Sequence, residues 1–206
     1  MSMLFYVSYA ALWILLVATA LLLLLLYRHF GLMALGTVEG VQRDGLPLGE
    51  EAPPLSGVTS DGKNVQWSPL HGPKVLLFGA PGCGPCAKIL PYFNALQGLH
   101  RDLDMTVFVA GPAQNAEALM AKYDLSTRCI ADDGSDAFGR FRVRVSPFGF
   151  VLGADGRIRS KGLCSDAVRF RELLSSGGLE NVAHSLDRLA SDRTKPLVEM
   201  TGHLRG

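Results

Sequence analysis

The chain has 206 residues, which is typical of one medium-sized domain with attachments and short for two domains. Its 20 basic residues nearly balance its 19 acidic residues, so charge gives no reason to expect binding to nucleic acid or to an anionic lipid surface. Four cysteines are too few for a disulfide-stabilised scaffold and are expected to include one working pair.

The N-terminal region is a long apolar stretch. No charged side chain precedes Arg28, and the run from Ala10 to Leu26 is apolar except for Thr19. Together with residues 3–9 it is long enough to cross a hydrocarbon core, which takes about 20 residues as a helix. A cleaved signal peptide, the alternative, would need a basic n-region and a shorter apolar core. The sequence therefore predicts a transmembrane anchor over residues 1–27 and a tether over residues 28–46.

The apolar pattern over residues 47–189 predicts alternating strands and helices in one domain. Strands are predicted at 64–67, 75–78, 105–110, 129–131, 148–152 and 157–160, the last two joined as a hairpin by Ala154-Asp155-Gly156. Helices are predicted at 86–99, 115–123, 135–141, 165–174 and 179–189, with Ser165 as an N-cap. This alternation is typical of an α/β domain with a mixed sheet. Residues 190–206 show no period and are expected to form a disordered tail.

The run Cys83-Gly84-Pro85-Cys86 follows a predicted buried strand and opens a predicted helix. At a helix N-terminus, unpaired amide N–H groups and the helix dipole stabilise a negatively charged sulfur, and the thiolate is the nucleophile in disulfide exchange. Pro85 lacks an N–H group and has a helical φ, which suits the first turn. The spacing predicts a redox-active disulfide in which Cys83 attacks and Cys86 resolves, with Gly84 and Pro85 as the active-site loop and no other cofactor.

Half of a zinc site is the main structural alternative for this pair. A closed zinc site needs four ligands, usually as a second Cys-x-x-Cys or a histidine pair at fixed spacing. The five histidines are dispersed, and Cys129 and Cys164 stand alone. The sequence therefore predicts no metal site.

The remaining cysteines, Cys129 and Cys164, have two interpretations. A free cysteine is commonly a small buried hydrophobic residue, and this interpretation is favoured. Alternatively, the two residues form a second disulfide or a relay pair for the first.

Ser146-Pro147 directly precedes the predicted strand 148–152, where proline would end strand pairing because it has no N–H donor. One interpretation is an ordinary trans proline at the start of a strand. The other is a cis bond in a loop that faces Cys83 and offers the backbone of Ser146 to an extended substrate.

The combination of a strand, Cys83-Gly84-Pro85-Cys86, a helix with Pro91, and Ser146-Pro147 before a hairpin resembles the thioredoxin superfamily. The resemblance implies a thioredoxin fold, with a mixed central sheet flanked by helices, and a cis Pro147. Residues 115–131 have room for an inserted helix and strand. With this insertion, the segment Gly49-Glu50-Glu51-Ala52-Pro53 and the anchor, the chain resembles the membrane-anchored TlpA-like branch.

Within that branch the chain is similar to the MauD family of methylamine dehydrogenase accessory proteins in length, in its single span and in Lys161-Gly162-Leu163 after the hairpin. This resemblance implies an enzyme of the bacterial inner membrane with its catalytic domain in the periplasm. It also implies assistance to disulfide formation or isomerisation in the small (β) subunit of an amine dehydrogenase, and a membrane thiol-electron carrier as redox partner.

Two positions depart from the superfamily pattern. Gly82 stands where most members carry Trp before the first cysteine, and Leu77 replaces the buried acid of thioredoxin. Cys86 therefore lacks that proton acceptor.

Three other interpretations stay open at this point. The chain could be a general TlpA-like disulfide reductase, for example in cytochrome c maturation, or an assembly chaperone without turnover. Arg28 after the span mildly favours a cytosolic domain by the positive-inside rule, whereas the redox chemistry favours export. The direction of the redox reaction is not set by the four residues of the motif.

Overall fold

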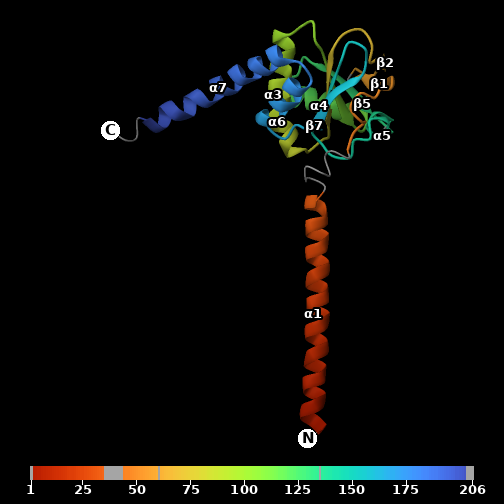
Figure 1. The fold of residues 1–206 in the computed structure, drawn as a ribbon, viewed down its shortest axis with the longest axis vertical. Helices are drawn as coiled ribbons and strands as arrows, with labels where there is room; N and C mark the ends of the chain where they lie inside the picture. Colours follow the sequence, from red (N-terminus) through yellow and green to blue (C-terminus); the bar gives the residue numbers. More distant parts are fainter. Residues whose placement is uncertain (1, 35–43, 60, 135, 203–206) are drawn as a thin grey trace. The chain divides into compact units, whose positions relative to one another are not determined.

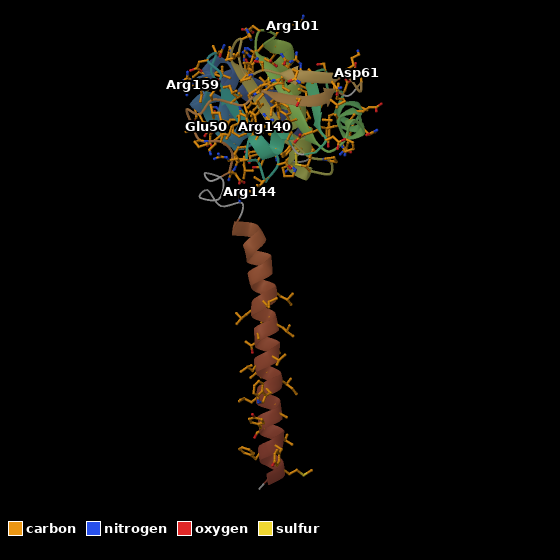
Figure 2. All side chains as sticks on the ribbon, turned by 90° about the vertical axis from the view of Figure 1, so that its right-hand side faces the viewer. Glu50, Asp61, Arg101, Arg140, Arg144 and Arg159 are labelled. Carbon is orange, nitrogen blue, oxygen red and sulfur yellow. A yellow bond between two sulfur atoms is a disulfide. The ribbon has the colours of Figure 1, made fainter. Side chains whose placement is uncertain are left out.

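The computed structural model describes residues 2–34, 44–59, 61–134 and 136–202, in two compact units divided between Arg43 and Asp44 (Figure 1). The first unit is helix α1 (Ser2–Ala34). Its segment Phe5–Leu25 is long and apolar enough to cross a membrane. Figure 2 shows nearly all-carbon side chains along α1, whereas charged groups such as Asp61, Arg101 and Arg159 lie on the surface of the second unit. The predicted apolar helix is confirmed.

The second unit contains a seven-stranded mixed sheet in the order β2-β1-β5-β4-β3-β6-β7. Neighbouring strands β3 and β4, and β4 and β5, are parallel, and the other pairs are antiparallel. The strands are β1 (Leu55–Thr59), β2 (Asn64–Trp67), β3 (Lys74–Gly79), β4 (Asp104–Ala110), β5 (Arg128–Asp132), β6 (Phe148–Leu152) and β7 (Ile158–Leu163). Central strands that are covered on both faces consist of continuous runs of apolar residues. For this reason β3, β4 and β6 could be predicted from the sequence.

Among the residues that the structure describes, five helices accompany the sheet: α3 (Gly84–Leu99), α4 (Ala113–Tyr123), α5 (Asp136–Arg140), α6 (Ala167–Ser176) and α7 (Glu180–Gly202). One face of the sheet packs its alternate residues, such as Leu77 and Val107, against α3, α4, α6 and the start of α7. Figure 1 shows α3, α6 and α7 together on this side. The predicted thioredoxin-like arrangement of a mixed sheet flanked by helices is confirmed.

The opposite face of the sheet is covered mainly by aromatic rings. Phe78 of β3 stacks on Phe108 of β4 at 5.2 Å between centroids, and Phe141 and Phe150 pack against it at 5.1 and 5.7 Å. All four side chains are fully buried. Burial of rings of this size supplies a large apolar contribution to folding, so β3 is held from both sides.

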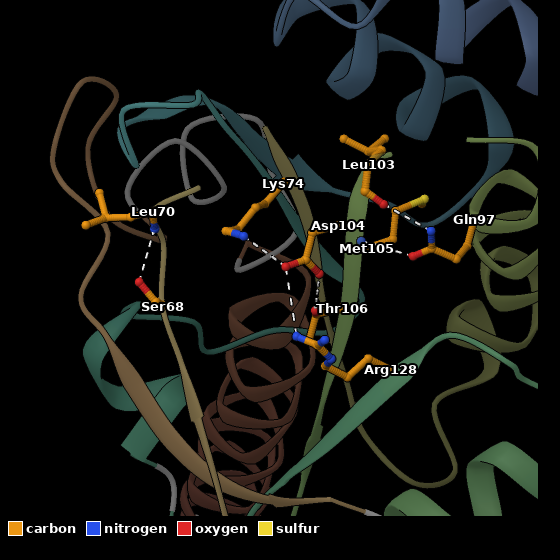
Figure 3. A network of polar contacts seen from close by, with 9 residues as sticks. All are labelled: Ser68, Leu70, Lys74, Gln97, Leu103, Asp104, Met105, Thr106 and Arg128. Carbon is orange, nitrogen blue, oxygen red and sulfur yellow. Dashed lines mark hydrogen bonds and ion pairs between the residues drawn. The ribbon is translucent and has the colours of Figure 1, made fainter. Parts of the chain in front are cut away.

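The beginning of β3 is held by a polar network (Figure 3). Lys74 is buried, and its ammonium lies 2.9 Å from the carboxylate of Asp104, the residue opposite it on β4. Thr106 donates a hydrogen bond to the same carboxylate, and Arg128 lies 3.9 Å away. A buried charge is tolerated when it is paired. The pairing fixes β3 in register at the end opposite to the cysteine motif.

The structure differs from the sequence predictions at several element ends. Strand β1 had no predicted counterpart, because its segment Leu-Ser-Gly-Val-Thr lacks a clear alternation and is stabilised by pairing with β2 and β5. The N-cap of α6 is Asp166 instead of Ser165: the Asp166 carboxylate accepts the Arg169 N–H at 2.9 Å, and the Ser165 hydroxyl donates to Asp166.

The two boundaries of the predicted domain also shift. The compact unit begins at Asp44, three residues before the predicted boundary, because Asp44 and Leu46 are buried and the Gly45 N–H donates to the Arg142 carbonyl at 3.0 Å. Helix α7 continues beyond Leu189 to Gly202, where a tail without secondary structure was expected. A helix can extend beyond its packed part because nucleation is the costly step. Pro196 lies within this extension and donates no backbone hydrogen bond.

Candidate active site

The cysteine motif lies where β3 gives way to α3. Cys83 is the N-cap of the helix, with extended backbone angles, and its sulfur accepts the N–H of Cys86 at 3.2 Å. Pro85 stands in the first turn, as expected for a residue without an N–H donor. Cys83 and Cys86 form a disulfide with 5.3 Å between their Cα atoms. The sequence-based placement of the pair at a helix N-terminus is therefore confirmed.

The two sulfur-bearing residues differ in exposure. Cys86 is 2% exposed and belongs to the core cluster formed with α3, α4 and α6, whereas Cys83 is only partly buried at its margin. A Cβ atom at Gly79 would lie 3.7 Å from the Cys86 sulfur, so that sulfur rests against the end of β3. Solvent and an incoming sulfur atom can thus reach Cys83 more readily than Cys86.

Leu77 on β3 is fully buried in the same apolar cluster as Cys86. This is the position at which the sequence departs from thioredoxin by lacking an acid. The environment beneath the disulfide is therefore apolar at this position, and Leu77 cannot accept a proton from the Cys86 thiol.

The Ser146–Pro147 peptide bond is cis. Phe148, which follows, pairs with Phe78 near the end of β3, so the proline loop lies at the same edge of the sheet as the cysteine motif. The Pro147 carbonyl accepts the N–H of Cys164 at 2.9 Å. Within the described residues, no hydrogen bond involves the backbone of Ser146.

Cys129 and Cys164 are not brought together. Cys129 lies on β5 and Cys164 directly follows β7, with β4, β3 and β6 between these strands. Four strand spacings of about 4.8 Å separate them by roughly 19 Å, and a disulfide needs Cα atoms within about 7 Å. Both residues are free and buried. The interpretation as a second disulfide is therefore wrong, and the two residues are separate core thiols.

Burial makes both core thiols poor nucleophiles. Loss of solvation raises the pKa of Cys129 to about 12, and it raises the pKa of the fully buried Cys164 as well, with the nearby Asp166 adding to the shift. Gly149 leaves room for Cys164, because a Cβ atom at Gly149 would lie 2.6 Å from its sulfur. The thiolate needed for exchange is therefore scarce at both residues near neutral pH.

Metal ligands do not gather near the cysteine motif. Among the residues that the structure describes, no group of three or more histidine, cysteine or acidic side chains is arranged to hold a metal ion.

Helix α4 adds residues to the site that were not predicted from the sequence. Its residues Asn115, Lys122 and Tyr123 line the same pocket as Cys83. Helical spacing predicted this helix, but no local sequence pattern indicated that it would lie beside the cysteine motif.

The sheet topology and the disulfide at a helix N-terminus define a thioredoxin-like thiol–disulfide oxidoreductase. A sequence model of the Redoxin family matches residues 47–173, and the chain belongs to this family. Solved structures share the fold. A protein assigned as a disulfide isomerase from Bacteroides thetaiotaomicron has a TM-score of 0.57 and 22% identity, and the match covers 63% of this chain and 87% of that protein. A protein assigned as the thiol:disulfide interchange protein DsbE from Chlorobium tepidum has a TM-score of 0.56 and 18% identity, and the match covers 64% of this chain and 99% of that protein.

The chain is also related over most of its length to proteins named methylamine utilization protein MauD. The protein from Methylorubrum extorquens is 27% identical over 178 residues, which span 82% of this chain and 84% of the relative. The protein from Methylophilus methylotrophus is 27% identical over 181 residues, which span 82% of each chain. The predicted resemblance to the MauD family is confirmed.

Proposed function

We propose that this chain is a membrane-anchored enzyme that forms or rearranges disulfides in an exported client protein, with Cys83 as attacking and Cys86 as resolving residue. The observation that carries this proposal is the contrast between a partly exposed Cys83 at the N-terminus of α3 and a buried Cys86 beneath it. The helix N-terminus stabilises a thiolate at Cys83, and burial keeps Cys86 from competing for the client.

Client oxidation starts from the Cys83–Cys86 disulfide. A client thiolate attacks the Cys83 sulfur, the bond between the two cysteines breaks, and Cys86 leaves as a thiolate that takes a proton from solvent. A second client thiolate then attacks the client sulfur of the mixed disulfide and releases Cys83. The client loses two electrons and the cysteine pair gains them. A membrane thiol-electron carrier is proposed to return the pair to the disulfide.

Isomerisation uses the reduced pair. The Cys83 thiolate attacks a client disulfide, and one client sulfur leaves as a thiolate. This thiolate attacks a different client disulfide, and the client thiolate released there attacks the client sulfur of the mixed disulfide. Cys83 then leaves as a thiolate, and the client keeps the same number of disulfides in a new pairing. If the mixed disulfide persists, the Cys86 thiol loses its proton to solvent and attacks Cys83, which releases the client as a thiol. The cis Pro147 loop is proposed to hold the client in an extended form during both reactions, because the Ser146 backbone has no hydrogen-bond partner among the described residues.

We place the domain in the periplasm of a bacterial inner membrane, with α1 as an uncleaved single-pass anchor. The length and apolar character of Phe5–Leu25 support a span. Protein disulfides persist in oxidising compartments outside the cytoplasm, which supports export over the weak bias from Arg28.

We infer the client from kinship: the small subunit of methylamine dehydrogenase or of a similar amine dehydrogenase. The support is the similarity to three proteins named for methylamine utilization, each aligned over at least 82% of this chain.

A Cys86→Ser variant tests the client and the compartment together. In this variant Cys83 can form a mixed disulfide that Cys86 cannot resolve, so the client should accumulate as a covalent adduct. We expect intact bacteria, treated with acid to stop exchange, to yield an adduct with the exported small subunit. The matched control, Cys83→Ser with Cys86→Ser, should yield none.

Two outcomes would contradict the proposal. Capture of cytochrome c apoprotein alone would indicate the general reductase instead. Full client maturation in cells that carry only the Cys83→Ser variant would indicate a chaperone that needs no turnover.

A further inference from the structure

A pocket of about 220 Å³ opens beside Cys83, between the active-site loop and α4. Its wall on the loop side includes Gly82, Cys83 and Ala87, and its wall on the other side is formed by one face of α4. The proline loop is not part of this lining. The pocket therefore offers a second surface to a client that is bonded to Cys83.

The α4 wall is apolar at its base and positively charged at its rim. Leu119 is 8% exposed and Ala118 is exposed, and both line the pocket. Lys122 is the only charged residue in this lining, and its ammonium lies 5.3 Å from the centroid of the Tyr123 ring. A cation over an aromatic face is attracted to it without losing its charge, so Lys122 is held beside the pocket.

Asn115 adds a fixed polar group to the same wall. Its amide nitrogen donates to the Ala110 carbonyl at 2.9 Å. Gly111 has φ +95°, and a Cβ atom there would lie 2.3 Å from that nitrogen, so the backbone closes tightly on the amide. The Asn115 carbonyl oxygen accepts no hydrogen bond from the described residues. It is thus available to accept one from a bound chain.

Gly82 belongs to the loop-side wall of the pocket. This residue has φ +73°, a left-handed backbone conformation that favours glycine, and a Cβ atom built on it would meet no atom within 4 Å. The wall of the pocket therefore carries no side chain at this position.

We propose that this pocket is a specificity subsite that receives an acidic side chain of the client, two residues away from the client's reacting cysteine. The proposal rests on the proposed function. In the mixed disulfide the client sulfur is bonded to Cys83, which itself lines the pocket. An extended chain advances about 3.3 Å per residue, and alternate side chains point the same way, so the second residue along reaches the α4 wall. The positive charge of Lys122 selects a carboxylate there.

Symmetric peptide disulfides test the subsite, because attack on either sulfur gives the same product. Each peptide carries one cysteine and one test residue, which is Glu, Gln, Lys or Gly. In the first set the test residue stands two positions before the cysteine, and in the second set it stands two positions after it. The full chain in detergent, reduced beforehand, converts each dimer to two thiol peptides, which chromatography measures as kcat/KM. For one of the two sets we expect the Glu peptide to react about three- to fivefold faster than the Lys peptide, as for a partly exposed charge pair.

Two pairs of variants separate the pocket from the chemistry. Lys122→Met should abolish the preference for Glu over Lys, whereas Lys88→Met, at an exposed lysine of α3 outside the pocket lining, should keep it. Ala118→Phe should fill the pocket and slow the Glu peptide about two- to threefold, to the rate of the Gly peptide, while leaving the Gly peptide unchanged. Ala121→Phe, on the exposed side of the same helix, should change neither.

The possible failures are distinguishable. Equal rates for Glu and Lys peptides in both sets, or an equal loss for Glu and Gly peptides in Ala118→Phe, would overturn the subsite and leave the oxidoreductase intact. If the unaltered chain reacts with none of the peptides, the proposed function itself fails.

Discussion

Cys83 and Cys86 lie at the edge of the sheet where β3 gives way to α3, whereas Cys129 and Cys164 lie inside the core, on β5 and just after β7. The first pair is joined in a disulfide at a helix N-terminus, and the second two are free thiols in apolar surroundings. The same side chain thus serves as a reactive group in one region and as a small core residue in the other. Position relative to helix ends and solvent sets this difference.

Removing one cysteine from each region gives the largest expected difference in activity. Cys83→Ser should lower the rate of peptide-disulfide reduction by at least about 10⁴-fold, because it removes the proposed attacking thiol. Cys129→Ala should retain the rate within about twofold, since Cys129 takes no part in exchange. The measurement is kcat/KM for the full chain in detergent, with circular dichroism to show that both variants are folded. A comparable loss in Cys129→Ala would assign the core thiol a role in turnover.

Alkylation compares the thiols directly. With a pKa of about 12, only about one Cys129 in 10⁴ is ionised at pH 8. In the reduced native protein, iodoacetamide should therefore modify Cys83 at least about 1000-fold faster than Cys129 or Cys164. Mass spectrometry of proteolytic peptides over time gives the rates, and labelling in denaturant provides the reference. Fast native labelling of either core cysteine would show that the core opens readily.

A smaller effect concerns the pH dependence of stability. The pKa of Cys129 is raised in the folded state, so the unfolded chain releases the proton first and stability falls as pH rises above about 9. We compare the drop in unfolding free energy from pH 9 to pH 11 in two oxidised proteins. This drop should be about 2 kcal/mol larger for the unaltered protein than for the Cys129→Ala variant. Urea unfolding at each pH measures this difference.

A buried residue without a titratable group serves as the control for that experiment. Met105→Ala should lower the unfolding free energy by a similar amount at every pH, because the deleted atoms do not titrate. If Cys129→Ala shows the same slope as the unaltered protein, the thiol is not shielded from water in the way that its burial indicates.

The amino-acid sequence was enough to predict the features that depend on neighbouring residues. The apolar run of α1, the strand before Cys83, the N-terminal placement of the cysteine motif and the hairpin after Pro147 all follow from local spacing and backbone chemistry. These features predicted an α/β domain with a redox-active cysteine pair, and the resemblance to the thioredoxin superfamily supplied the particular fold.

The contacts between segments that are distant in the sequence became known from the folded structure. It separated Cys129 from Cys164 by three intervening strands, placed the α4 residues beside Cys83, and drew Asp44 into the domain, where Arg144 pairs with its carboxylate at 2.6 Å. The physical reason is that strand order and helix packing depend on the burial of whole faces of the sheet, which no local pattern in the chain encodes.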